Sequence, residues 1–412
     1  MTNARPGELG TRAGPNRRKR TALAAFTLPW HTDAASKLVV AMTSFMADIE
    51  IERVEALPLC IPFDHWAPPP LFAGQPRTTI DVLLVRVTTN NGLIGWGEAY
   101  GGTWPSTVVA IKSWVAPLAI GQDPRDLNLT QRLERTLHNL GRAGPTLHAI
   151  SGLDIALWDL RGKIEGVPVH VLLGGKKRSR IQAYASLLQY SNDLDAIRRN
   201  VTRALDRGYR QIKLHERSAE AVAATRETTG ADIPIMVDTN CAWTPDAATA
   251  AVVAMKPSNP LWVEEPIWPP EDFASLAALR KTTGIPTAIG ENATGVLDFR
   301  KMIAADAVDY VQPSAIKLGG LTNLWRVCTD AEADGVTCVP HAPFFGPGYL
   351  ATLHVLAAKQ RESFLERFFC NMAAVPYDKT VPVAEGWVDV PDAPGLGADP
   401  EPELLSRYLM SV

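Results

Sequence analysis

Three short segments decide the fold: IMVDTN at residues 235–240, LWVEEP at 261–266 and TAIGEN at 287–292. Each opens with the apolar residues of a buried strand and closes with acidic or amide side chains. Helix-like stretches separate the three segments, so they are predicted to be successive strands of a parallel sheet. Because the carboxyl ends of parallel strands meet on one side of a sheet, their acidic residues are expected to be neighbours.

The same alternation continues along residues 179–378, which we predict to be one catalytic domain. Eight strands are predicted, at residues 181–188, 209–215, 233–239, 261–266, 287–292, 308–314, 336–341 and 364–367. Eight strands alternating with helices in roughly 190 residues predict an α/β fold with a closed, TIM-like (β/α) barrel. A doubly wound sheet would need fewer strands.

A separate α+β capping domain is predicted for residues 48–178. It has strand patterns at 49–59 and 79–88, a hairpin turn at Asn90-Asn91-Gly92, and helical periodicity at 108–118, 127–140 and 147–164. Residues 60–74, which include three consecutive prolines, are expected to form a long loop. The Pro-, Gly- and Asp-rich segment 379–412 is expected to pack back onto the cap.

The composition is typical of a globular enzyme that acts on a small molecule. The 412 residues include 41 Lys and Arg against 44 Asp and Glu, and 46% are apolar. This balance favours neither nucleic acid nor an anionic membrane as a partner, and no apolar run approaches the roughly 18 residues of a membrane span. Five scattered cysteines without a Cys-x-x-Cys pair argue against disulfides or a thiolate zinc site and indicate a reducing cytoplasm.

Residues 1–47 differ from the rest in charge. They carry seven bases and two acids, which leaves about −8 on the remainder of a chain whose net charge is −3. We expect either a disordered basic leader or a sequence that begins too early, with the natural start of the protein at Met42 or Met46. An export signal is less favoured, because the apolar run 21–30 is short and contains Pro29.

Polar residues end the predicted barrel strands at regular intervals. From Lys213 the intervals are 25, 26, 27, 23, 27 and 25 residues, through Asp238, Glu264, Glu291, Ser314, His341 and Glu366. Each interval is one strand-helix repeat. In a (β/α) barrel these residues therefore converge on one mouth, where active sites form.

A metal site is predicted from the three acids on consecutive strands, Asp238, Glu264 and Glu291. Buried carboxylates this close together would repel each other unless a cation joined them. Oxygen ligands without His or Cys favour one Mg²⁺ over zinc. The neighbouring polar residues are expected to hold these ligands and the waters of the metal; they are Asn240, Glu265 and Asn292.

Proton-transfer residues are predicted on both sides of this metal. Lys213 and His215 lie on the second strand, on one face because side chains alternate, and His341 lies on the seventh. The lysine charge is expected to lower the pKa of His215, so that a neutral imidazole accepts a proton near pH 7. The alternative for each histidine is a structural, hydrogen-bonded group.

The chain resembles the enolase superfamily, and within it the mandelate racemase and muconate lactonizing enzyme group. The motifs that carry the resemblance run from about residue 49 to the end: GWGE at 95–98, the helix 149–163, VDTN at 237–240, WVEEP at 262–266, GEN at 290–292, KLGG at 317–320, LER at 365–367 and PDAPGLG at 391–397. The resemblance implies a modified, enolase-type barrel. It also implies a Mg²⁺ ion that stabilises the enediolate formed when a base removes the proton α to a substrate carboxylate.

Particular roles follow from the resemblance. Asp238, Glu264 and Glu291 match the metal ligands. Glu366 matches a position that donates a hydrogen bond to the substrate carboxylate, which requires a protonated acid with a raised pKa. Relatives are often dimers to octamers, so a homo-oligomer is expected.

Two departures from the family pattern stand out. Many members have Lys-x-Lys on the second strand where this chain has Lys213-Leu214-His215, so the base there is His215 or Lys213. Members that use the strand-seven histidine pair it with a strand-six aspartate, and this chain has Ser314 instead. Lys317 belongs to the Lys-x-Gly-Gly turn, which the resemblance makes structural.

The reaction predicted first is dehydration of a hydroxy or sugar acid, with His341 assisting hydroxide departure. Racemisation or epimerisation ranks second, followed by cycloisomerisation. A non-catalytic binding barrel and a zinc amidohydrolase are rivals, although the intact carboxylates oppose the first and the lack of an early His-x-His opposes the second. Specificity is expected from the loop 60–74 and the mouth, with substrate contacts from Phe63, His65, Trp66, Trp243 and Phe344.

Overall fold

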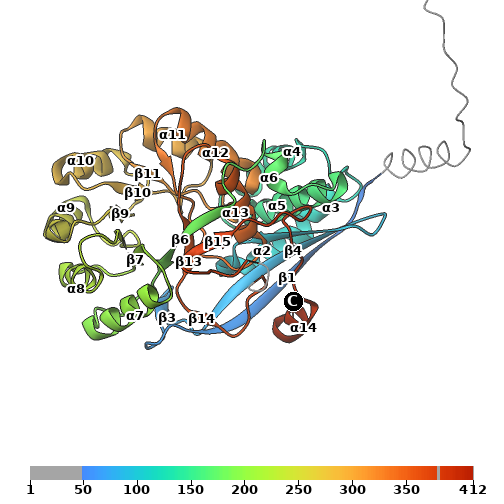
Figure 1. Ribbon diagram of the computed structural model, residues 1–412. Helices are drawn as coiled ribbons and strands as arrows, with labels where there is room; N and C mark the ends of the chain where they lie inside the picture. The colour runs from blue at the N-terminus through green and yellow to red at the C-terminus, as the bar shows by residue number, and fades with distance from the viewer. Residues whose placement is uncertain (1–48, 378–380, 412) are drawn as a thin grey trace, which may run out of the picture. The chain divides into compact units, whose positions relative to one another are not determined.

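The computed structural model describes residues 49–377 and 381–411. Two layers of structure dominate this part of the chain: a barrel of parallel strands surrounded by helices, and an α+β cap (Figure 1). The predicted basic leader, residues 1–47, lies outside the described residues, as do both methionines proposed as alternative starts.

Eight parallel strands form the barrel sheet, in the order β12-β11-β10-β9-β8-β7-β6-β13. The prediction of eight barrel strands is confirmed. The strands are β6 (Arg180–Ser186), β7 (Ile212–Leu214), β8 (Ile235–Asp238), β9 (Trp262–Glu264), β10 (Thr287–Ile289), β11 (Tyr310–Val311), β12 (Thr337–Cys338) and β13 (Leu365–Phe368).

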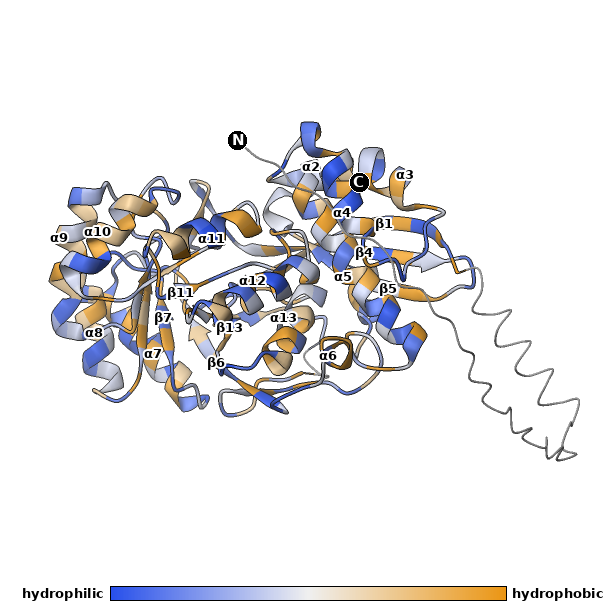
Figure 2. Cartoon of the chain, turned by 90° about the horizontal axis from the view of Figure 1, so that it is seen from above, coloured by the Kyte–Doolittle hydropathy of each residue, from blue (hydrophilic) through white to orange (hydrophobic). Residues whose placement is uncertain are grey.

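Seven helices alternate with these strands and lie outside them in Figure 1. They are α7 (Leu194–Asp206), α8 (Ala219–Thr229), α9 (Pro245–Met255), α10 (Phe273–Thr283), α11 (Val296–Ala304), α12 (Leu321–Ala333) and α13 (Pro347–Ala358). The amphipathic α7 turns Ile197 and Val201 inward, and its N-terminus is capped by the Asp193 side chain. Hydropathy colouring shows the same inward bias of apolar residues (Figure 2).

The cap contains an antiparallel sheet in the order β14-β1-β4-β5. The predicted hairpin is confirmed: β4 (Thr79–Thr89) pairs with β5 (Ile94–Ala99), and Gly92 takes a left-handed φ of 82° in the turn. The predicted long loop was wrong at its start, because β1 (Ile51–Asp64) stays paired with β4 through Pro62 and with β14 (Asn371–Met372) at Phe63. Only the rest of that segment leaves the sheet, in a small hairpin of β2 (Leu71–Phe72) and β3 (Gln75–Pro76).

One long helix, α5 (Pro145–Glu165), joins the cap sheet to the barrel. It begins with proline in its first turn and ends at Gly166, whose φ of 69° terminates the helix. It packs so closely on β5 that a Cβ at Gly97 would lie 1.9 Å from the backbone oxygen of Gly152. The predicted helix 108–118 is present with a π-helical turn, Ile111–Val115, between α2 (Trp104–Ala110) and α3 (Ala116–Ala119). The predicted helix 127–140 appears as α4 (Leu129–Thr136) and a 3₁₀ turn, His138–Leu140.

The C-terminal segment touches both layers. Strand β15 (Trp387–Asp389) pairs antiparallel with the barrel strand β6. Helix α14 (Pro402–Tyr408) then lies against the cap, where Leu404 packs with Leu59 and Ile61 of β1. Across residues 49–377 and 381–411, no helix combines the length and apolar character needed to cross a bilayer.

Candidate active site

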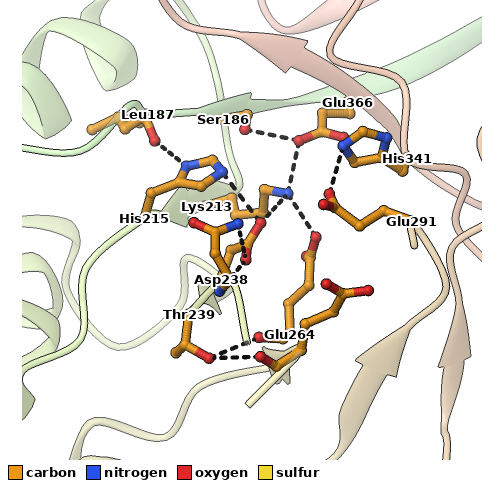
Figure 3. Close-up of polar contacts among 12 residues, drawn as sticks. Ser186, Leu187, Lys213, His215, Asp238, Thr239, Glu264, Glu291, His341 and Glu366 are labelled. Atoms are coloured by element: carbon orange, nitrogen blue, oxygen red, sulfur yellow. Dashed lines mark hydrogen bonds and ion pairs between the residues drawn. The ribbon is translucent and has the colours of Figure 1, made fainter. Parts of the chain in front are cut away.

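Three carboxylates converge at the carboxyl ends of consecutive barrel strands. Asp238 ends β8, Glu264 ends β9 and Glu291 follows β10. One oxygen from each lies within 4.8 Å of the others (Figure 3). The regular spacing of the sequence thus places the predicted ligands together, and the all-oxygen donor set fits a hard divalent cation.

Lys213 lies at the centre of this group, on β7. Its ammonium is 3.2 Å from Asp238, 2.9 Å from Glu264 and 2.8 Å from Glu366. Burial alone would lower the pKa of Lys213, but Glu264 and Glu366 raise it well above its ordinary value. With three carboxylate acceptors around it, this lysine acts as a fixed cation within the cluster.

The three carboxylates differ in their affinity for protons. Burial and then the charge of Asp238 raise the pKa of Glu264. Burial also raises the pKa of Asp238, but the charges of Lys213 and His215 outweigh the effect of burial, and the pKa of Asp238 is lowered. For Glu291 the nearby His341 overcomes burial and lowers the pKa to about 2. The site therefore holds more negative charge than its own lysine can balance, which is the condition for cation binding.

His215 shares the face of β7 with Lys213, as predicted, and both reach Asp238. Its Nε2 is 3.2 Å from Asp238, while Nδ1 is 2.5 Å from the backbone oxygen of Leu187. The predicted direction of its pKa shift was wrong. Burial and Lys213 lower the pKa of His215, but the charge and hydrogen bond of Asp238 prevail and raise it. The prediction considered only Lys213, which is close in sequence, and not the carboxylate of Asp238 on the adjacent strand.

His341 lies across the mouth from His215 (Figure 3). Its Nε2 is 2.7 Å from Oε2 of Glu291. Its Nδ1 is buried, and among the described residues it has no hydrogen-bond partner; the same holds for the hydroxyl of Ser314. The strand-six aspartate that the resemblance implies as a partner of this histidine is therefore absent, and no described acid takes its place at Nδ1.

Glu366, on β13, binds three groups and was expected to be a protonated acid. Oε1 accepts from Ser186 at 2.8 Å and contacts Lys213, and Oε2 accepts from the Ala342 amide at 3.0 Å. Burial raises the pKa of Glu366, but Lys213 and His341 together outweigh burial and lower it, so this arrangement does not favour the expected protonated acid. Ser186 was missed, although it ends β6 and precedes Lys213 by 27 residues, the same spacing as the other strand ends.

Of the three residues expected to support the ligands, Asn240 and Asn292 contact them directly, and Glu265 is linked to them through Asn292. Asn240 donates from its amide side chain to Asp238 at 2.9 Å. Asn292 donates to Glu265 at 2.6 Å and to Glu291 at 3.4 Å. Burial and then Glu291 raise the pKa of Glu265 to about 8.

A cavity of about 440 Å³ opens above these residues between the barrel and the cap. The floor of the cavity is formed by His215, Glu291 and His341. The volume of the cavity suits a small organic acid. Lys317 also lines it, with Nζ 3.2 Å from the side-chain oxygen of Asn292, so this lysine faces the cavity and is not only part of a structural turn. The cap contributes lining residues for which sequence reasoning had no signal, among them Phe72, Arg77, Asp81, Glu98 and Tyr100.

Of the five residues expected to contact substrate, only Phe344 lines this cavity. Phe63 pairs with Met372 within the cap sheet, and His65 stacks on Tyr190 with ring centroids 5.4 Å apart. Trp66 packs on Phe369 and under the guanidinium of Arg203, and Trp243 forms a bridge with Ile267. Phe63 packs in the cap cluster, whereas Trp66 and Trp243 pack against the barrel core, so these side chains are used in packing.

A (β/α) barrel with three facing carboxylates at its strand ends, covered by an α+β cap, defines a capped barrel enzyme with an acidic triad that could bind a metal. The chain belongs to the mandelate racemase / muconate lactonizing enzyme family: residues 61–174 match the N-terminal domain of that family, and residues 196–404 match the enolase C-terminal domain-like family.

Similar proteins act on sugar acids and their derivatives. D-galactarolactone cycloisomerase of Agrobacterium fabrum is 30% identical over 80% of this chain and 91% of its own. D-galactonate dehydratase of Ralstonia nicotianae is 31% identical over 77% of this chain and 88% of its own. Among solved structures, a racemase from Streptomyces coelicolor with bound magnesium is 26% identical, with a TM-score of 0.78 over 87% of this chain and 100% of that one.

Proposed function

We propose that this protein is a Mg²⁺-dependent enzyme that removes the proton α to a substrate carboxylate and dehydrates a hydroxy or sugar acid. The observation that carries the proposal is the carboxylate triad within 4.8 Å, flanked by His215 and His341 on opposite sides of one cavity. Membership of the family and the dehydratases among its relatives support the same chemistry.

Asp238, Glu264 and Glu291 would hold one Mg²⁺ per subunit, with Asn240 and Asn292 steadying the ligands. When bound, the cation would stabilise the negative charge of the enediolate, which is the largest electrostatic contribution that such a reaction requires. Their three oxygen donors on rigid strand ends fit this role. Relatives of known structure are described with bound magnesium, which supports the choice of ion.

The protein's own groups would divide the proton transfers. Lys213 is surrounded by three carboxylates, so we assign the strand-two base to His215 and give Lys213 the role of a positioning cation. His341 would deliver a proton to the departing β-hydroxyl from the other side. Glu366, held by Ser186 and Lys213, would lie beside the carboxylate end of the substrate, and its protonated form would donate a hydrogen bond to that carboxylate.

Racemisation or epimerisation is the second candidate, followed by cycloisomerisation. Two histidines on opposite sides of a cavity could remove a proton from one face of the substrate and return it to the other face. This arrangement is the observation that favours racemisation or epimerisation. The cycloisomerases among the relatives keep the third reaction open.

The test is a library of hydroxy, sugar mono- and diacids and aryl hydroxy acids, incubated with enzyme and Mg²⁺ in ²H₂O. Incorporation of deuterium at the α carbon, followed by NMR, reports proton abstraction whatever the later steps. A 2-keto product identifies dehydration, and inversion without a keto product identifies the racemase. No exchange with any acid would refute the proposal.

We further place the protein in the cytoplasm as a homo-oligomer. Its five cysteines are all free thiols, which supports a reducing compartment. Sedimentation of the purified protein tests the oligomeric state.

A further inference from the structure

The cavity above the metal site has a second charged region, formed where the cap meets the barrel. Arg77 reaches it from the cap, Lys317 from the barrel, and Tyr100 from the end of β5. The Lys317 ammonium lies 5.2 Å from the centre of the Tyr100 ring. Burial and then the charge of Glu291 raise the pKa of Tyr100, while Arg77 lowers it, so Tyr100 lies within electrostatic range of both groups.

The two cations of this region are held in place, and no described carboxylate forms a direct ion pair with either of them. Arg77 is fixed by donation from Nε to the backbone oxygen of Thr79 at 3.2 Å and by the Phe72 ring, 4.8 Å away. Lys317 donates to the neutral amide of Asn292. Across residues 49–377 and 381–411, neither cation has a carboxylate within 4.0 Å, in contrast to Lys213 with its three.

The charge of the cavity wall outside the triad is positive. Arg77, Arg217 and Lys317 line it. The acids that line the same wall are Asp81, which lies close enough to Arg77 to offset part of its charge, and Glu98. Burial raises the pKa of Glu98 to about 8, so this carboxyl is largely protonated at neutral pH. A net positive wall facing an aqueous cavity favours an anionic group there.

Resting on the proposed function, we propose that Arg77 and Lys317 form a distal subsite for a second carboxylate, so that the substrate is a dicarboxylic sugar acid. One carboxylate of the substrate would lie at the metal end, near Glu366, and the other between the guanidinium and the ammonium. A planar guanidinium fixed at Nε leaves its terminal nitrogens free to donate to a carboxylate. A monoacid of the same length would place a neutral hydroxymethyl group against two unpaired cations.

The experiment compares matched pairs of six-carbon acids that differ only at the far end, such as galactarate and D-galactonate, over several configurations. Dissociation constants are measured by calorimetry with Mg²⁺ present, for the wild type, Arg77→Met, Lys317→Met and the exposed control Lys301→Met. We expect the best diacid to bind the wild type about 10- to 100-fold more tightly than its monoacid. Either cavity variant should bring this ratio close to one without weakening the monoacid, and the control should keep the wild-type ratio.

Two results would overturn the subsite: monoacids that bind as tightly as their diacids, or variants that weaken both acids equally. Deuterium exchange at the α carbon is followed in the same samples and reports the proposed function separately. If the enzyme exchanges the α proton but binds the monoacid more tightly than the diacid, the distal subsite alone is refuted. Selective binding of diacids through Arg77 and Lys317, with no exchange of any acid, would refute the proposed function alone.

Discussion

The ammonium of Lys213 lies 2.8 Å from Oε1 of Glu366, although 153 residues separate them in the sequence. The two residues come from β7 and β13, which both pair with β6. The same ammonium contacts Asp238 and Glu264, so one lysine offsets charge on both sides of the first barrel strand.

Replacing Lys213 should destabilise the protein in a way that Mg²⁺ partly reverses. Lys213→Met leaves buried carboxylates without their cation, which costs about 3–5 kcal/mol of unfolding free energy. A divalent ion bound by Asp238 and Glu264 would replace part of the lost charge. Urea unfolding with EDTA and with Mg²⁺ measures both effects.

The control for the effect of Mg²⁺ on Lys213→Met is the variant Lys359→Met. Lys359 is also a buried lysine, 3.4 Å from Glu332 and outside the site. Its variant should lose stability equally with and without Mg²⁺. An equal response of the two variants to the ion would contradict a metal site next to Lys213.

Removing one ligand should abolish both metal binding and proton abstraction. Glu291→Gln keeps the shape of the side chain but loses its charge, and we expect α-proton exchange to fall about 1,000-fold. EDTA should do the same to the wild type, with recovery on adding Mg²⁺. Glu271→Gln, an exposed acid nearby, is the control. Full activity of Glu291→Gln without metal would show that the triad is not the reaction centre.

The two histidines should have separable effects. We expect His215→Asn to lower α-proton exchange, and His341→Asn to lower dehydration, each by about 100- to 10,000-fold. If His341 serves only the departing hydroxyl, exchange should survive in His341→Asn. The exposed His138→Asn is the control, and both measurements come from one NMR time course. Unchanged exchange and turnover in both site variants would disprove the assigned roles.

Glu98 should make stability depend on pH. This cap residue accepts from the Gly348 amide at 2.8 Å, and burial raises its pKa from 4.5 to about 8. Between these two values the folded state keeps a proton that the unfolded state has released. The free energy of unfolding contributed by Glu98 therefore falls as pH rises, by up to about 1.4 kcal/mol per pH unit, and levels off above the folded pKa.

Glu98→Gln removes this contribution, so its unfolding free energy should fall less steeply than that of the wild type. Urea unfolding at about pH 5.5, 6.5 and 7.5 measures the two slopes. Glu165→Gln, an exposed change on α5, should keep the wild-type slope. Parallel curves for Glu98→Gln and the wild type would show that Glu98 is charged in the folded protein.

Much of the fold could be predicted because barrel repeats are local in sequence. The segments around Asp238, Glu264 and Glu291 each combine an apolar strand with a polar end, and their spacing fixed their convergence. The failures concern side chains whose surroundings come from distant segments. His215 was assigned the wrong pKa direction because Asp238 on the next strand outweighs the adjacent lysine. Phe63 and Trp66 were placed in the mouth because nothing local indicates that β1 continues.

The sequence by itself determined the barrel, the acidic triad and the histidines beside it, since the period of the repeat dictates which residues share the carboxyl face. Only the tertiary structure decided how the cap covers that face. Arg77 and Tyr100 lie far from Lys317 in the chain, and no periodicity relates them. Their meeting in one cavity depends on the docking of β5 and α5 against the barrel, which is a property of packing between elements. Examples are the hydrogen bonds that the Gly348 amide donates to Glu98 of β5 and the Gly319 amide donates to Ser151 of α5.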